Sequence, residues 1–140
     1  AGVVGEEVLQ SIEDFGLMDC VRQMGYLSHD KVLETQQKSQ LLLLLEIDSE
    51  ETRGIIPGKL FEYLNAKRPI LAIGPKGWEA GNMVEKHQAG HMCLHQDVAS
   101  LKRVVLEAFQ KYEKGNLNCD SVGVEHYHRR ALTESLAKFI

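Results

Sequence analysis

The chain has 140 residues, 44% of them hydrophobic and 26% charged, a composition typical of a globular domain that excludes disorder and collagen-like structure. Sixteen basic and twenty acidic residues give a formal net charge of −4, so the chain lacks the positive field of a general nucleic-acid binder and no nucleic-acid partner is expected. The longest apolar run, Leu41–Leu45, is far shorter than the roughly 20 residues of a membrane-spanning helix, and no transmembrane segment is expected.

Short apolar runs alternate with amphipathic helical patterns along the chain. The first half predicts, in order, a strand at Ala1–Val4, a helix from Glu6 to about Phe15, a strand at Val21–Met24, a helix at Lys31–Ser39 and a strand at Leu41–Ile47. The second half predicts a helix at Gly58–Ala66, a strand at Pro69–Ile73, a helix at Trp78–His87, a strand at His91–Leu94, a helix from the cap Asp97 to Gly115, and a final helix from about Val124 to Ile140.

Strands separated by helices predict an α/β fold, with a Rossmann-like parallel sheet of about five strands flanked by helices. The leucines of Leu41–Leu45 do not alternate with polar residues, which is typical of a central strand covered on both faces. We expect residues 1–140 to form a single domain, with a core over 1–115 and a loop and closing helix over 116–140.

The loop 48–59 is the most informative one, because ligands of open parallel sheets bind beyond the carboxyl ends of the strands. It contains Arg53 and enters a helix at Gly58 and Lys59, where unpaired N–H groups and partial positive charge suit phosphate. Gly58 permits close approach to the backbone, and Lys59 adds a mobile cation. A plain turn before a helix would give the same pattern, and the P-loop motif is excluded because Leu60 stands where Ser or Thr is needed.

Glu62 lies one turn into the same helix. A carboxylate near the ligand end of such a helix can accept two hydrogen bonds from a cis-diol. A solvated glutamate on a helix surface would give the same sequence pattern.

The run Gly58–Ala72 (GKLFEYLNAKRPILA) resembles the donor-binding signature of GT-B fold glycosyltransferases, and is most similar to the group-1, family-four-like class with its bacterial polysaccharide members. In that class, a glutamate in a Glu-Ala-Met-Ala-x-Gly-x-Pro-type segment binds the ribose hydroxyls of a nucleotide-sugar. Glu62 matches this glutamate, and Pro69 matches the proline. Tyr26 and Leu27 lie in a segment that resembles the strand-end turn whose backbone meets the nucleobase.

The resemblance covers most of residues 3–138 and implies a domain that binds a UDP- or GDP-linked sugar, for transfer to an acceptor in surface polysaccharide or glycan synthesis. The implied donor-binding residues are Arg53, Gly54, Gly58, Lys59 and Glu62, and Tyr26 and Leu27 are implied to contact the nucleobase. No metal and no tightly bound cofactor is expected. The acceptor, a glycan or lipid, would be held by an N-terminal domain, so we expect the chain to be an N-terminally truncated fragment that is inactive alone.

Gly54 departs from the family pattern. It stands eight residues before Glu62, where the family carries another glutamate that touches the donor sugar or assists catalysis. No catalytic residue is therefore assigned, and the donor sugar and the stereochemical outcome stay open.

Three alternative functions remain open. They are a nucleotide-sugar epimerase of the same fold, a non-catalytic nucleotide-binding module and a receiver-like signalling module. The last would use Glu6, Glu7, Asp48 and Lys76, but no further strand carrying Ser or Thr lies between Asp48 and Lys76.

The cysteines, histidines and open sheet edge complete the expectations. Cys20, Cys93 and Cys119 are odd in number and form no C-x-x-C motif, which favours a protein of the reducing cytoplasm. The resemblance allows the whole enzyme to sit at the inner face of the membrane through its N-terminal domain. The six histidines, His87, His91 and His95 among them, are interpreted as surface residues rather than zinc ligands. We expect Leu41–Ile47 to pair directly with the first strand, or its exposed edge to support a homo-oligomer.

Overall fold

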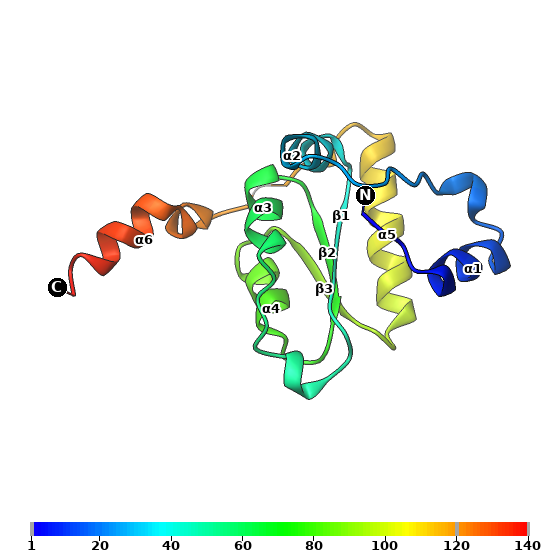
Figure 1. The fold of residues 1–140 in the computed structure, drawn as a ribbon. Coiled ribbons are helices and arrows are strands. Elements are labelled where there is room, and N and C mark those ends of the chain that lie inside the picture. The colour runs from blue at the N-terminus through cyan, green and yellow to red at the C-terminus, as the bar shows by residue number, and fades with distance from the viewer. Residues whose placement is uncertain (1, 120, 140) are drawn as a thin grey trace. The chain divides into compact units, whose positions relative to one another are not determined.

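The computed structural model describes residues 2–119 and 121–139, and its chain divides into two compact units, residues 1–35 and 36–140 (Figure 1). The first unit contains helix α1 (Glu6–Asp14) and the 3-10 helix η1 (Met18–Cys20). Helix α2 (His29–Lys38) begins in the first unit and ends in the second, which also contains the sheet.

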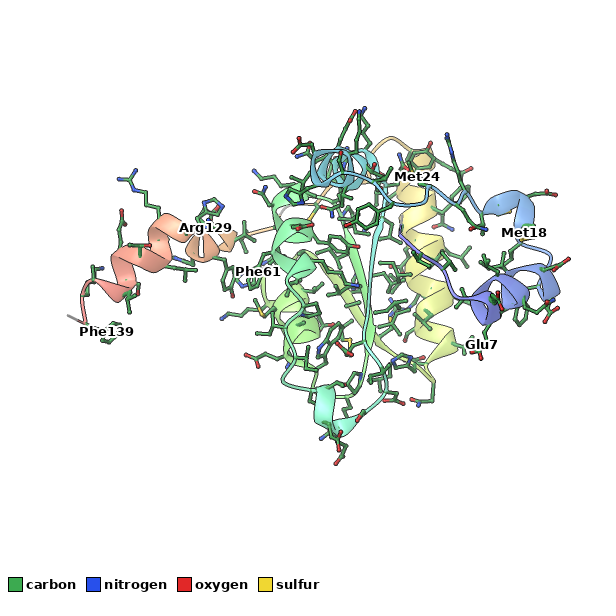
Figure 2. All side chains as sticks on the ribbon, viewed as in Figure 1. Glu7, Met18, Met24, Phe61, Arg129 and Phe139 are labelled. Carbon is green, nitrogen blue, oxygen red and sulfur yellow. The ribbon has the colours of Figure 1, made fainter. Side chains whose placement is uncertain are left out.

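Helix α1 confirms the first predicted helix. Two backbone bonds close its end, from Gly16 to Glu13 and from Leu17 to Ile12, and Gly16 adopts a left-handed φ of 63° that favours glycine. The helix has no buried residue, and the η1 side chain Met18, labelled in Figure 2, is 49% exposed. The first unit therefore exposes much of its apolar surface when it is considered by itself.

The two predicted N-terminal strands are absent from the described residues. Ala1 lies outside them, Val3 and Val4 are exposed, and Val21–Met24 belongs to no strand and has no ladder partner. One backbone bond, from Gly2 N–H to the Gly25 carbonyl, joins the two segments. Apolar composition alone does not make a strand, because a strand also needs a neighbour that satisfies its backbone groups.

The described residues form a parallel sheet of three strands, β1 (Leu42–Leu45), β2 (Ile70–Gly74) and β3 (Gly90–Leu94), in the order β1-β2-β3. Helices α3 (Lys59–Ala66) and α4 (Glu79–Lys86) make the two crossovers. The predicted α/β class, with helices flanking a parallel sheet, is confirmed. The prediction of five strands is wrong, because the two N-terminal runs do not join the sheet.

Helices cover both faces of this sheet, α3 and α4 on one side and α5 (Val98–Glu113) on the other (Figure 1). The larger core cluster lies on the α3–α4 side and includes Leu42, Leu44, Leu60, Leu64, Ile70, Trp78 and Val84. The smaller cluster, on the α5 side, consists of Leu71, Cys93 and Val104 with Leu41, Ile73 and Leu101 packed against it. The face that bears α3 is therefore the better-packed one.

Strand β1 is an edge strand, which corrects the prediction of a central strand covered on both faces. Leu42 and Leu44 point into the α3–α4 core, whereas Leu43 and Leu45 are 47% and 50% exposed. Among the described residues β1 has a strand neighbour on one side only, and at this edge of the sheet the helix on the second face leaves Leu43 and Leu45 about half exposed. Within β1, therefore, only alternate leucines are buried, and they lie on one face of the sheet.

Asp97 caps α5 as predicted. Its carboxylate accepts a hydrogen bond from the Ser100 amide at 3.0 Å, and this bond holds the pKa of Asp97 below its usual value. The predicted final helix is divided into η3 (Val124–Tyr127) and α6 (Arg129–Leu136), because His128 between them is extended. Ile140, the predicted end, lies outside the described residues. No helix in residues 2–119 and 121–139 is long and apolar enough to cross a membrane.

His87 is buried, at 6% exposure, so its assignment as a surface residue is wrong. Its Nδ1 lies 2.7 Å from the Val122 carbonyl and its Nε2 lies 2.9 Å from the Tyr127 hydroxyl. A carbonyl can only accept, so Nδ1 donates to Val122, and in the neutral ring Nε2 accepts from the Tyr127 hydroxyl. The ring holds the segment that follows α5 against the end of α4.

We expect Gly90→Ala to destabilise the second unit strongly. An added Cβ would lie 1.8 Å from the Ile70 carbonyl oxygen of the neighbouring strand, so β2 and β3 would have to separate. Overpacking of this kind costs about 1–3 kcal/mol or more, measurable by urea unfolding. Gly54→Ala is the matched control, because its added Cβ meets nothing within 4 Å. Equal stability of the two variants would contradict the close approach at Gly90.

Candidate functional site

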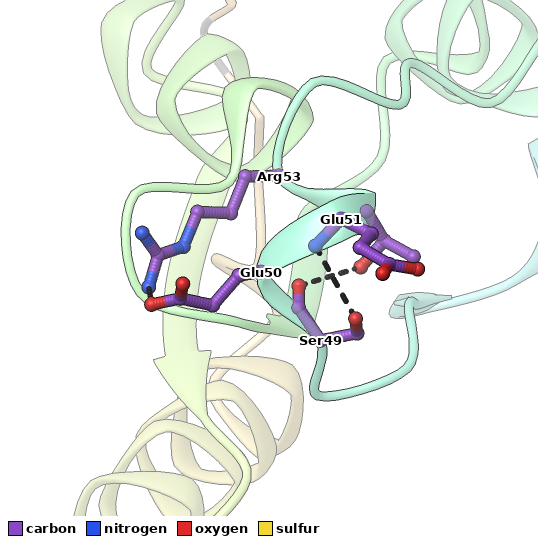
Figure 3. Close-up of polar contacts among 5 residues, drawn as sticks. Ser49, Glu50, Glu51 and Arg53 are labelled. Atoms are coloured by element: carbon purple, nitrogen blue, oxygen red, sulfur yellow. Dashed lines mark hydrogen bonds and ion pairs between the residues drawn. The ribbon is translucent and has the colours of Figure 1, made fainter.

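The loop after β1 is shaped by local hydrogen bonds around η2 (Glu50–Thr52) (Figure 3). The Ser49 hydroxyl accepts from the Glu51 amide at 3.2 Å, and the Thr52 hydroxyl donates to the Ser49 carbonyl at 3.0 Å. Arg53 contacts Glu50 at 2.7 Å, with both side chains largely exposed. Such surface ion pairs contribute little, about 0–1 kcal/mol, so this pair leaves the guanidinium available to a competing anion.

Trp78 fixes the second half of this loop. The indole is fully buried, and its Nε1–H donates to the Ile55 carbonyl at 2.8 Å. The Glu79 amide, at the start of α4, donates to the Arg53 carbonyl at 2.8 Å. The indole also fills the space where a Cβ on Gly74 would lie, 2.5 Å from the ring. These contacts fix the position of the loop just before α3 begins.

The start of α3 is open to solvent. Gly58 and Lys59 are exposed, the cap position carries no side-chain hydrogen bond, and an added Cβ on Gly58 meets nothing within 4 Å. In the part of the chain that the structure describes, no backbone acceptor pairs with the amides of Gly58 and Lys59. Packing therefore does not require glycine at position 58, and the free N–H groups can receive an anion.

Glu62, in the first turn of α3, is half-buried and has a specific partner. The Gln36 amide Nε2 donates to Glu62 Oε2 at 2.9 Å. Gln36 is 8% exposed, and its Oε1 is buried with no hydrogen-bond partner among the described residues. An unsatisfied buried acceptor of this kind costs about 1–3 kcal/mol.

The adjacent Tyr63 packs against the larger core cluster. Burial raises the pKa of the Tyr63 phenol, and the negative charge of Glu62 raises it further.

The predicted donor-site residues fall into two groups. Arg53, Gly54, Gly58, Lys59 and Glu62 lie along one continuous stretch, the end of the loop and the first turn of α3. Tyr26 and Leu27 belong to the first unit, where Tyr26 is 91% exposed. Their predicted contact with a nucleobase remains a prediction. Gln36 had no place in the predicted site, since a glutamine in a helical pattern gives no specific signal.

A cavity of about 420 Å³ lies elsewhere in the second unit. Its lining includes Ile70 and Gly90, at the amino ends of β2 and β3, together with Glu107 and Cys119. It contains none of the predicted site residues and lies at the opposite end of the strands from loop 48–59. Within residues 2–119 and 121–139 no group of three or more His, Cys, Asp or Glu side chains is placed to hold a metal ion.

No family model, curated protein or solved structure matches this chain.

We expect Trp78→Phe to lower the free energy of unfolding by about 1–3 kcal/mol, because phenylalanine leaves the Ile55 carbonyl without its donor. The loop between β1 and α3 should also become more sensitive to limited proteolysis. Urea unfolding and mapping of the cleavage sites test both effects. Unchanged stability with an uncleaved loop would show that the indole N–H does not fix the loop.

Proposed function

We propose that this chain is the donor-binding domain of a GT-B-type glycosyltransferase, which binds a UDP- or GDP-linked sugar for transfer to a glycan or lipid acceptor. The observation that carries the proposal is the placement of Glu62: a half-buried carboxylate one turn inside a helix whose first amides, at Gly58 and Lys59, are open. These two features match the two parts of a nucleoside diphosphate, its ribose and its phosphates.

The diphosphate binds at the start of α3 in this proposal. The free amides of Gly58 and Lys59 and the positive end of the helix attract the phosphate oxygens, and Gly58 leaves room for them beside the backbone. Lys59 and Arg53 supply two mobile cations. Arg53 leaves its weak surface pair with Glu50 to contact the phosphates.

The ribose binds at Glu62. Its carboxylate oxygens together have about four acceptor sites, so they can receive both hydroxyls of a cis-diol while one site stays occupied by Gln36. Gly54 presents no side chain to the donor sugar, so the group that assists transfer, like the acceptor, comes from another part of the enzyme.

We expect Glu62→Gln to weaken UDP and GDP binding roughly ten- to hundredfold, because it replaces charge-assisted hydrogen bonds worth about 1.5–3 kcal/mol. Titration calorimetry measures the effect. Glu79→Gln is the matched control, since Glu79 is an exposed glutamate in the first turn of the neighbouring helix α4. Equal affinities for wild type and Glu62→Gln, or no binding of either nucleotide, would contradict the proposal.

We expect Glu50→Gln to tighten UDP binding roughly two- to fivefold, because the substitution frees Arg53 from its carboxylate partner. Glu51→Gln is the control, because it removes the same negative charge from the adjacent exposed position without freeing Arg53. It therefore separates the release of Arg53 from the general loss of one negative charge. Uridine, which lacks phosphate, should bind all three proteins equally. A gain that is equal for Glu50→Gln and Glu51→Gln would show that Arg53 does not contact the phosphates.

A further inference from the structure

Gln36 contacts the candidate ribose carboxylate, although it lies 26 residues away in the chain on a different helix. Its Nε2 donates to Glu62 Oε2 at 2.9 Å. The orientation of the amide follows from its partner, because the reverse orientation would place two oxygen acceptors in contact. The contact joins the end of α2 to the first turn of α3.

Packing alone does not explain a glutamine at this position. The side chain is 8% exposed, and its Oε1 is inaccessible to solvent and without a hydrogen-bond partner in the described part of the chain. Methionine has a similar length and shape and would fill the same space without an unsatisfied acceptor. The amide leaves one acceptor unsatisfied, and what it gains in return is the bond from its donor group to Glu62, which an apolar side chain could not make.

We infer that Gln36 is a positioning residue for the donor: it holds the Glu62 carboxylate in the orientation that receives the ribose hydroxyls. The inference rests on the proposed function of Glu62. A free glutamate samples several rotamers, and a ligand must then select one of them at an entropic cost. The bond to Gln36 restricts the Glu62 side chain in the free protein, so the ligand loses less binding free energy to ordering it.

An amide suits this role better than a cation. Lysine or arginine would also hold the carboxylate, but their positive charge would neutralise it and compete with the ribose hydroxyls. A neutral donor leaves the negative charge on Glu62, and hydrogen bonds to a charged acceptor are the stronger ones. Gln36 occupies one acceptor site on Oε2, and the remaining sites stay open to the ligand.

The test uses Gln36→Met in the full chain, with Gln37→Met as its matched control at the adjacent exposed position. Gln36→Asn is a second variant, whose shorter amide does not reach Glu62. The ligands are UDP or GDP, whichever wild type binds more tightly, and the 2′,3′-dideoxy form of that nucleotide. Calorimetry gives the affinities, and thermal unfolding gives the stability of each variant.

Gln36→Met is expected to unfold at the wild-type temperature or above it, yet to bind the ribonucleotide roughly three- to tenfold more weakly. Its affinity for the dideoxy nucleotide should equal that of wild type, because this ligand has no hydroxyls for Glu62 to receive. Gln36→Asn should show the same selective loss, and Gln37→Met should change neither affinity. A purely structural role would instead lower stability and weaken both ligands equally.

Two results would overturn the inference in distinguishable ways. If Glu62→Gln abolishes the preference for the ribonucleotide while Gln36→Met and Gln36→Asn retain it, Glu62 binds ribose without help from Gln36, and only the positioning role is wrong. If wild type binds neither nucleotide, or Glu62→Gln leaves the preference intact, the proposed function fails and the inference fails with it.

Discussion

The parallel pairing of β1 with β2 is the constraint on which the rest of the second unit depends. Two parallel neighbours cannot be joined by a tight turn, so the chain between Leu45 and Ile70 must return along the sheet before β2 begins. Helix α3 makes that return, and its first residue, Lys59, therefore lies on the side where β1 ends. The candidate site is a consequence of strand direction.

The loop that makes this turn is held more firmly than its composition indicates. A buried indole and a helix-start amide bind two of its carbonyls, those of Ile55 and Arg53, while Gly54 and Gly58 remain open. Rigid support with an open backbone is what phosphate recognition requires, because the donors must be oriented before the anion arrives. The two halves of the site also differ in charge. Lys59 and the helix end are positive, and Glu62 is a carboxylate one turn further in.

The sequence predicted the helices well and the sheet only in part. Helices such as α1 and α5 depend on local periodicity and on caps such as Asp97, all of which can be read from neighbouring residues. Strands depend on partners that are distant in sequence. Val21–Met24 has a strand-like composition, but it has no ladder partner. The leucines of β1 were predicted to be buried on both faces, although only one face is covered.

The candidate site shows the same division. The continuous stretch from Arg53 to Glu62 could be found because its residues are adjacent in the chain and resemble a known motif. Gln36 could not, since its significance lies in one contact made after folding. His87 was likewise taken for a surface residue, because its partners Val122 and Tyr127 are 35 and 40 residues away. Long-range polar contacts leave no periodic signal in a single sequence.

Nuclear magnetic resonance of the ¹⁵N-labelled chain, titrated with UDP and with GDP, shows where the nucleotide binds. We expect the largest amide shifts on Gly58 and Lys59, extending to Glu62, with a matching shift of the Gln36 side-chain NH₂ signals. Shifts centred on Gly90 and Cys119 would instead place the nucleotide in the cavity at the amino ends of the strands, and α3 would not be the binding site. The absence of any shift at millimolar nucleotide would contradict the proposed function.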